Sequence, residues 1–270
     1  MADNRGEQLT VLDTLIVERV GTAGLVSLNR PDRLNAINRQ MVHDLAAACE
    51  LLARDDLIAA VVFSGVGRTF CAGADISVIS QLEGAQDFLG FLGDIQGAFD
   101  VIDEFVKPTI AAVNGLAFGG GCELAIACDL RVMAADAALG VPEVKIGVLP
   151  GAGGTQRLPR LLPQAVAKRM LLFGDPISAD EALRHGVVNE VAATPSDVLA
   201  VAIAWARRLG ELPPLALRAA KELVRIAADG DLRTGLQAER QAVALLFGTD
   251  DRREGMRAFL EKRSAVFGGR

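Results

Sequence analysis

The sequence predicts an α/β fold of alternating strands and helices that continues into a helical C-terminal part. Three observations predict it. Short apolar runs of strand length recur, segments with helical spacing of apolar residues separate them, and helix-capping signals replace the apolar runs from about Gly153 onward. Alternation of this kind is typical of parallel strands joined by right-handed crossovers. No repeat at a fixed period is detectable, so a solenoid of identical units is not indicated.

The N-terminal elements are predicted to form a hairpin and then a β-α-β unit. Two β-rich runs between Val11 and Leu28 flank the turn-forming stretch Gly21-Thr22-Ala23-Gly24, which predicts a hairpin. The segment Asn38 to Arg54 places its apolar residues at helical intervals, and Ile58 to Phe63 is a continuous apolar run. We therefore expect a parallel pairing with a right-handed crossover.

The same unit recurs in the middle of the chain. A helix is predicted through Ala98 to Phe105 and a short strand at Thr109 to Val113. A glycine-rich turn then leads into a helix from about Gly120, and another strand follows near Leu130 to Ala134. The recurrence is structural, because the residues themselves do not repeat.

The C-terminal third is predicted to be helical. Capping signals stand at Ser178-Ala179-Asp180-Glu181 and Thr194-Pro195-Ser196-Asp197, and amphipathic helices are predicted at Pro214 to Ile226 and Thr234 to Phe247. Because their apolar stripes must be buried, we expect these helices to cover the mouth of an active site or to form a subunit interface. The chain is therefore expected to be an oligomer.

Composition excludes several classes of protein. The 270 residues are 51% hydrophobic and carry a net charge of -6, and no long run of Lys or Arg occurs, so nucleic acid is not expected as the main partner. The first residues, MADNRGEQ, lack the features of a leader peptide. The longest uncharged stretch, Pro108 to Cys122, is shorter than the roughly 20 apolar residues of a membrane span. We expect a cytoplasmic protein without membrane contact.

Several familiar catalytic and binding patterns are absent from the sequence. The two histidines, His43 and His185, lack a G-x-S-x-G partner, which argues against a hydrolase triad. Three glycine clusters lack the third glycine of the dinucleotide-binding pattern G-x-G-x-x-G, because Phe70, Leu124 and Gln156 occupy that position. The four cysteines match neither a zinc pattern nor a disulfide framework, so we expect reduced, partly buried thiols and no metal site: Cys49, Cys71, Cys122 and Cys128.

Three segments instead combine glycines with carboxylates. They are FCAGADI (70–76), NGLAFGGGCE (114–123) and VPEVKIGVLPGAGGTQRL (141–158). Glycine-rich turns let a ligand approach the backbone, and the first amides of a following helix lack internal partners. If two such turns face each other, two N–H groups can converge on one oxygen and stabilise an oxyanion.

Two glutamates, Glu123 and Glu143, lie at expected helix starts within these segments. One interpretation is that both merely complement helix dipoles, which is worth a few tenths to about 1 kcal/mol. Against it, Glu123 stands in the apolar stretch GGGCELAIAC, where a buried carboxylate is costly without a purpose. From the pattern alone both interpretations stay open.

The three segments, in this order and spacing, resemble those of the crotonase superfamily and specifically of the enoyl-CoA hydratases. The likeness extends from NRPDRLNAIN (29–38) to EGMRAFLEKR (254–263). It implies a crotonase-like spiral of repeated β-β-α units over residues 1–200, which contains the active site. It also implies a helical region over residues 201–270 for trimerisation and active-site cover, with hexamers as paired trimers.

The resemblance also implies roles for individual residues. The amides of Ala74 and Gly120 match the positions of the family's oxyanion hole, and Glu123 and Glu143, which are 20 residues apart, match its catalytic pair. The implied reaction is addition of water at C3 of a trans-2-enoyl-CoA thioester, with Glu143 donating a proton to C2. Coenzyme A is then part of the substrate, and no metal or redox cofactor is implied.

Substrate contacts follow from the same resemblance. The adenine of coenzyme A is expected against the backbone near Arg33 and Leu34, with Phe259 and Lys262 reaching the site from a neighbouring subunit. A solvated surface charge remains an equal interpretation for Arg33 and Lys262. Further contacts are expected from residues beside the glycine turns: Ala72, Asp75, Ile76 and Gly151. The segment Gly84 to Gly97 flanks the acyl tunnel in relatives, which leaves chain-length preference open.

Two other functions compete with hydration. An enoyl-CoA isomerase of the same superfamily shuttles a proton with one principal carboxylate and usually lacks an acid at the position of Glu123. A non-catalytic acyl-CoA-binding protein would keep the fold and lose turnover. The presence of both glutamates favours hydration over each of these.

Overall fold

Strands of two sheets alternate along the chain in the computed structural model, which describes residues 6–270. The strands are β1 (Glu7–Val11), β2 (Leu15–Val20), β3 (Ala23–Leu28), β4 (Ala60–Gly65), β5 (Thr69–Cys71), β6 (Thr109–Val113), β7 (Leu116–Phe118), β8 (Leu130–Ala134), β9 (Ala138–Gly140), β10 (Ile177–Ser178) and β11 (Glu190–Ala192). The helices up to residue 146 are the 3-10 helices η1 (Pro31–Arg33) and η2 (Pro142–Ile146) and the α-helices α1 (Arg39–Arg54), α2 (Ile76–Ile79), α3 (Ala85–Asp103) and α4 (Gly120–Ala127). The helices that follow are α5 (Gly154–Leu161), α6 (Gln164–Phe173), α7 (Ala179–Arg184), α8 (Pro195–Gly210), α9 (Pro214–Asp229), α10 (Leu232–Phe247) and α11 (Asp250–Glu261).

The strand order defines a spiral. One sheet has the order β1-β2-β3-β4-β6-β8-β11 and the other the order β10-β9-β7-β5. From β4 to β9, each strand of the larger sheet is followed by a strand of the smaller one, and the pairs within this stretch are parallel. The predicted α/β spiral of β-β-α units is confirmed.

The N-terminal predictions are largely confirmed. Strands β2 and β3 pair as an antiparallel hairpin, and β3 pairs in parallel with β4 across helix α1. The turn is shorter than predicted: it consists of Gly21, with φ 63°, and Thr22, while Ala23 and Gly24 already belong to β3. Strand β1, which pairs with β2, was not predicted.

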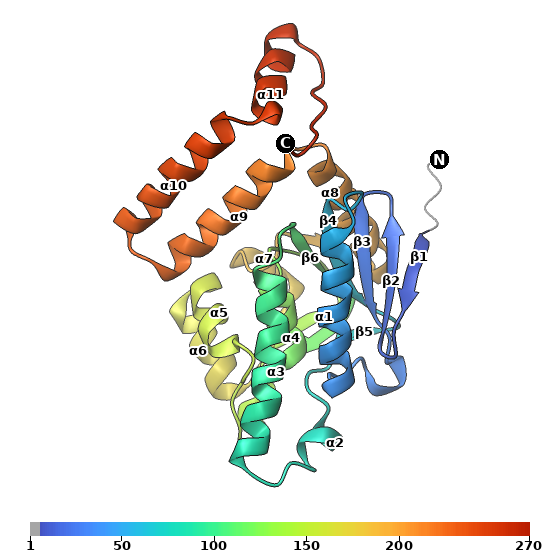
Figure 1. Cartoon of the computed structure of the whole chain (residues 1–270). Helices are drawn as coiled ribbons and strands as arrows, with labels where there is room; N and C mark the ends of the chain where they lie inside the picture. The colour runs from blue at the N-terminus through green and yellow to red at the C-terminus, as the bar shows by residue number, and fades with distance from the viewer. Residues whose placement is uncertain (1–5) are drawn as a thin grey trace.

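Helix α3 begins at Ala85, well before the predicted start at Ala98. Three glycines, at residues 90, 93 and 97, lower the helical propensity of this stretch. Burial of one helical stripe, which contains Phe91, Ile95, Phe99 and Ile102, outweighs that cost. Helices α1 and α3 pack against each other and lie side by side in Figure 1, with α4 behind α3.

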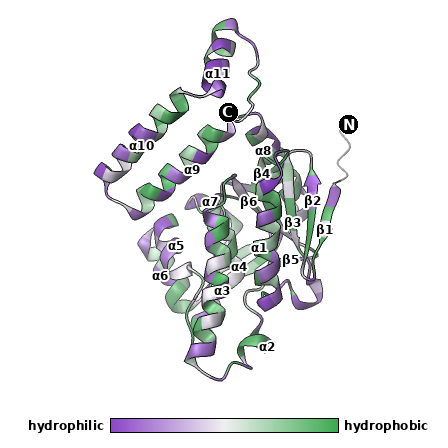
Figure 2. Cartoon of the chain, in the orientation of Figure 1, coloured by the Kyte–Doolittle hydropathy of each residue, from purple (hydrophilic) through white to green (hydrophobic). Residues whose placement is uncertain are grey.

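The C-terminal helices begin where the capping signals predict. The Ser178 hydroxyl accepts from the Glu181 N–H at the start of α7, and the Thr194 hydroxyl accepts from the Asp197 N–H at the start of α8. Helix α8 packs against β4, β6 and β8. Helices α9, α10 and α11 project from this body (Figure 1). No residue of α9 or α10 is buried, although both helices carry apolar side chains (Figure 2).

Two further expectations concern the chain as a whole. All four cysteines are free and buried, as predicted. No helix among residues 6–270 is long and apolar enough to cross a membrane. The expectation about a leader peptide falls mainly on residues 1–5, which lie outside the described residues.

Candidate active site

The first two glycine-bearing segments meet beside the loop that precedes α1. The Ile37 N–H donates to the Gly73 carbonyl, and the Asp75 N–H donates to the Ile37 carbonyl, both at 2.8 Å. Gly73 has φ 103°, and a Cβ there would stand 2.8 Å from the Phe118 carbonyl oxygen. Only glycine therefore allows the turn after β5 to pack directly on the turn after β7.

The amides of Ala74 and Gly120 lie close together in this packed pair of turns. A Cβ built on Gly120 would stand 3.5 Å from the Ala74 nitrogen. Gly120 is the first residue of α4, so its N–H has no acceptor within the helix. Within residues 6–270, neither of the two N–H groups donates to a protein acceptor. Both donors are thus free to bind one oxygen.

The turn before α4 also brings Glu143 to the site. Gly119 has φ 52° and ψ -125°, and a Cβ there would stand 2.8 Å from Glu143 Oε1. Its N–H donates to the Gly140 carbonyl at 2.8 Å, which ties the turn to β9 and so to the η2 segment that carries Glu143. Absence of a side chain at Gly119 makes room for the carboxylate.

Glu123 is held by main-chain donors. Its side chain lies on α4, all of whose residues are buried, and the residue is 2% exposed. Oε1 accepts the N–H groups of Ala152 and Gly154 at 2.8 and 2.7 Å. Burial raises the pKa of Glu123, and the two hydrogen bonds and the charge of Arg157 oppose that rise. The carboxylate is therefore fixed in orientation and partly stabilised as an anion.

Glu143 has a different environment. Its Oε2 is buried and has no hydrogen-bond partner among the described residues. Burial, followed by the nearby charge of Glu123, raises the pKa of Glu143 to about 7. A carboxyl group that keeps its proton near neutral pH can donate it, whereas its anchored neighbour can accept one.

Two side chains that the sequence analysis did not single out hold the loop that precedes α1. Asn35 is fully buried with φ 55°, and its amide donates to the carbonyls of Val66, Thr69 and Phe70. Arg30 pairs with Asp75 at 3.0 Å. Both residues lie in the segment NRPDRLNAIN, which is part of the family resemblance, but the resemblance did not identify what their side chains do.

The predicted substrate-binding residues around the turns lie near one another. The Leu34 carbonyl accepts the Ala72 N–H at 3.0 Å, and Arg33 is exposed beside Leu34. Ile76 is exposed at the start of α2. The carboxylate of Asp75 is engaged by Ser77 and Arg30, which lower its pKa. These contacts build the turn that presents the Ala74 amide.

The remaining predicted residues fall in two places. The Gly151 carbonyl accepts from Gln96 Nε2 at 2.6 Å, next to the amides that bind Glu123. Phe259 and Lys262 lie on and just after α11, and Figure 1 places α11 at the far end of the molecule from α4. Within one chain, the structure does not bring these two residues to the glutamates.

Known proteins resemble this chain over nearly its whole length. Residues 18–270 match the family described as enoyl-CoA hydratase/isomerase. The chain is 41% identical over 261 residues to a 2,3-dehydroadipyl-CoA hydratase of Escherichia coli K12, covering 96% of this chain and 100% of the relative. It is 40% identical to a crotonyl-CoA hydratase of Syntrophomonas wolfei, over 94% of this chain and 98% of the relative.

A solved structure shows the same fold. The crystal structure of an enoyl-CoA hydratase from Bacillus anthracis superposes with a TM-score of 0.91 at 35% identity, and covers 96% of this chain and 100% of its own. The predicted resemblance to the crotonase superfamily, close to the enoyl-CoA hydratases, is confirmed.

Proposed function

The chain belongs to the enoyl-CoA hydratase/isomerase family, and on that premise we propose that it adds water across the 2,3 double bond of a trans-2-enoyl-CoA thioester. The observation that carries the proposal is the pair of dissimilar carboxyl groups, Glu123 and Glu143, beside two free amides. One carboxyl is anchored by backbone donors, and the other has a pKa of about 7.

The two amides bind the thioester oxygen. As water attacks C3, electrons move from the double bond through C2 to the carbonyl, and the oxygen of the resulting enolate carries negative charge. The N–H groups of Ala74 and Gly120 bind this oxygen more strongly than the neutral carbonyl, and this difference lowers the barrier. Their position at the N-terminus of α4 adds the favourable end of the helix dipole.

The two carboxyl groups handle the protons. Glu123, held by Ala152 and Gly154, accepts a proton from the water whose oxygen bonds to C3. Glu143 gives its proton to C2 as the enolate collapses. One proton enters and one leaves the protein, so the net change is addition of one water molecule. The reaction as proposed uses no metal or redox cofactor, because these four groups supply every step.

A direct assay separates hydration from its alternatives. Incubation of the purified protein with crotonyl-CoA removes the absorbance of the conjugated thioester if water adds to the double bond. An isomerase would instead convert a 3-enoyl-CoA to the conjugated isomer and raise that absorbance. Binding of acyl-CoA without turnover across several chain lengths would contradict the proposed function. The same panel of chain lengths defines the acyl preference.

We expect a bell-shaped dependence of kcat/KM on pH. Glu143 must be protonated to act as the acid, so the rate falls as pH rises through its pKa of about 7. Glu123 must be ionised, so the rate also falls at acidic pH, below a pKa that burial holds above its usual range. Because the two carboxyl groups interact, the apparent pKa values of the acidic and alkaline limbs of this profile belong to the pair and not to either residue alone. Initial rates between pH 5 and 10 test this, and a flat profile on the alkaline side would exclude Glu143 as the acid.

We further propose a homotrimer, or a hexamer of paired trimers, formed through the projecting helices. The support is that α9 and α10, each of 16 residues, bury none of their side chains within the chain. Large apolar side chains stand exposed on this region: Val224, Leu232, Val243, Leu245, Phe259 and Leu260. Sedimentation should give at least three times the mass of one chain, and Leu245→Glu should lower that mass. A monomer at micromolar concentration would contradict this assembly.

Assembly is also the route by which Phe259 and Lys262 of a neighbouring subunit would reach coenzyme A. The four buried free thiols support a cytoplasmic localisation, because free thiols persist in reducing compartments.

A further inference from the structure

We propose that Arg157 is a positioning residue that keeps Glu123 in its working orientation by holding the loop Gly151–Gly154. The inference rests on the proposed function, since it concerns how the proposed base is held. Arg157 does not touch the reacting atoms. It acts through Ala152, whose carbonyl accepts from Arg157 and whose N–H donates to Glu123.

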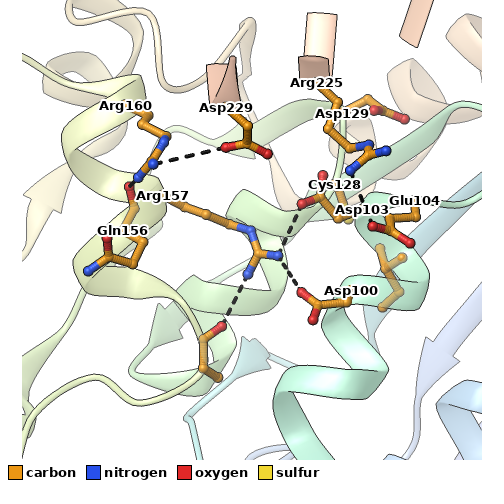
Figure 3. Close-up of polar contacts among 12 residues, drawn as sticks. Asp100, Asp103, Glu104, Cys128, Asp129, Gln156, Arg157, Arg160, Arg225 and Asp229 are labelled. Carbon is orange, nitrogen blue, oxygen red and sulfur yellow. Dashed lines mark hydrogen bonds and ion pairs between the residues drawn. The ribbon is translucent and has the colours of Figure 1, made fainter. Parts of the chain in front are cut away.

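The contacts form a continuous chain. Arg157, on α5, donates through Nη1 to the Ala152 carbonyl at 3.2 Å. The N–H of the same Ala152 donates to Glu123 Oε1 at 2.8 Å. On its other side, Nη2 of Arg157 pairs with Asp100 Oδ1 and Asp103 Oδ2, each at 3.0 Å (Figure 3). One guanidinium thus connects the loop to helix α3.

Helix α3 holds this loop along a single stripe. Leu92 packs against Gly151, and Gln96 Nε2 donates to the Gly151 carbonyl at 2.6 Å. Asp100 and Asp103 follow at the spacing that keeps them on the same helical face. Arg157, on α5, connects the last two residues of this stripe to the loop, because its guanidinium binds both Asp100 and Asp103 and also the Ala152 carbonyl.

The burial and geometry of Arg157 suit this role. Its side chain is 19% exposed, less than either acid, so the ion pairs are partly shielded from solvent. Gly153 has φ 111°, and a side chain there would overlap the Arg157 guanidinium. The planar fork reaches three acceptors at fixed angles, which a lysine ammonium on its flexible stem reproduces poorly.

The charge of Arg157 also acts on Glu123. It favours the carboxylate and opposes the effect of burial on the Glu123 pKa. The other groups that interact with Glu123 are Glu143, from η2, and the neutral thiol of Cys122, from its own helix. Arg157 is thus a cation whose charge favours the ionised form of the buried Glu123.

The matched control for Arg157 is a second arginine that lines the same hollow, a cavity of about 790 Å³ beside the loop. The hollow is lined by residues of α5 and α9 together with Ala152 and Gly153. Arg160 lies in the same hollow one helical turn after Arg157, and pairs with Asp229 and the Gln156 carbonyl (Figure 3). Among the described residues, no hydrogen bond or ion pair joins Arg160 to the loop Gly151–Gly154. Arg160→Gln removes an equivalent charge without releasing the loop.

The test measures kcat, KM and the pH profile of hydration for Arg157→Gln, Arg157→Lys and Arg160→Gln. Arg157→Gln should lower kcat by about 10- to 100-fold with KM nearly unchanged, because a displaced base loses alignment and not binding. Its acidic limb should move to higher pH. Arg157→Lys should restore the position of that limb but only part of kcat, and Arg160→Gln should resemble wild type.

Asp103→Asn provides a second route if Arg157→Gln does not fold. It weakens the same clamp from α3 and should lower kcat in the same direction by a smaller factor. Wild-type kcat and an unmoved acidic limb in Arg157→Gln would overturn the proposal, as would wild-type kcat in Asp103→Asn where Arg157→Gln is insoluble. Failure of the wild-type protein to hydrate any enoyl-CoA would overturn the proposed function instead, so the two failures are distinguishable.

Discussion

Glu143→Gln is expected to lower kcat for hydration by about 10²- to 10⁴-fold, the usual contribution of a positioned acid or base. The amide keeps the size of the side chain but cannot give a proton to C2. KM should change little, because the substrate is bound through other groups. Steady-state rates with crotonyl-CoA measure both constants, and the alkaline limb of the pH profile should disappear in the residual activity.

Glu123→Gln should cost a similar factor for a different reason. Its Oε1 accepts two main-chain N–H groups, so a glutamine can still place its carbonyl there and keep the fold of the loop. What is lost is the group that accepts a proton from water. The residual rate should lack the acidic limb, in contrast to Glu143→Gln. Near-normal kcat in either variant would remove that residue from the mechanism.

Loss of folding does not explain the expected effect at Glu143. A raised pKa means that the folded protein holds this proton more tightly than the unfolded chain. Ionisation of this partly buried carboxyl group therefore costs stability as pH rises from about 4.5 to about 7. Above that range Glu143→Gln removes the cost, so the variant should be at least as stable as wild type. Glu50→Gln, at an exposed ion pair on α1, is the matched control and should leave kcat unchanged.

Gly120→Pro is expected to lower kcat by about 10²-fold or more, because it deletes one of the two donors to the enolate oxygen. Gly120 is the first residue of α4, a position where proline is compatible with the helix. Binding of a saturated acyl-CoA should be weakened much less than kcat, since the donor is most important in the transition state. Calorimetry and steady-state rates measure the two effects separately.

The second donor offers a cleaner comparison at one position. Ala74→Pro deletes the amide, whereas Ala74→Gly keeps the amide and removes only the methyl group. We expect a loss of about 10²-fold for the proline variant and less than about 10-fold for the glycine variant. Equal activity of Ala74→Pro and Ala74→Gly would mean that the thioester oxygen is bound elsewhere.

Much of the site follows from local sequence. The glycines before Ala74 and Gly120 are required by backbone conformation and close packing, and both stand in the glycine-bearing segments FCAGADI and NGLAFGGGCE. Burial of Glu123 follows from the apolar residues around it on α4. The hairpin, the strands β6 and β8, and the caps at Ser178 and Thr194 are likewise local features, set by short-range periodicity and hydrogen bonding.

Other features depend on contacts between distant residues. The three-residue strands β5, β7 and β9 are too short to carry a periodic signal, and they form because they pair with one another. The first half of α3 contains glycines and forms because its apolar stripe is buried. Local propensity is weak in both cases, and tertiary burial decides.

The sequence by itself determined the alternation of strands and helices, the glycine-bearing turns and the two candidate glutamates, since each of these depends on residues adjacent along the chain. The spiral of β-β-α units was implied by the family resemblance. Only the tertiary structure decided that Glu123 is anchored by Ala152 and Gly154, while Oε2 of Glu143 has no hydrogen-bond partner within residues 6–270. It also decided that Arg157 joins the anchoring loop to α3. The physical reason is that protonation and orientation depend on desolvation and on donors from remote segments, which adjacent residues do not specify.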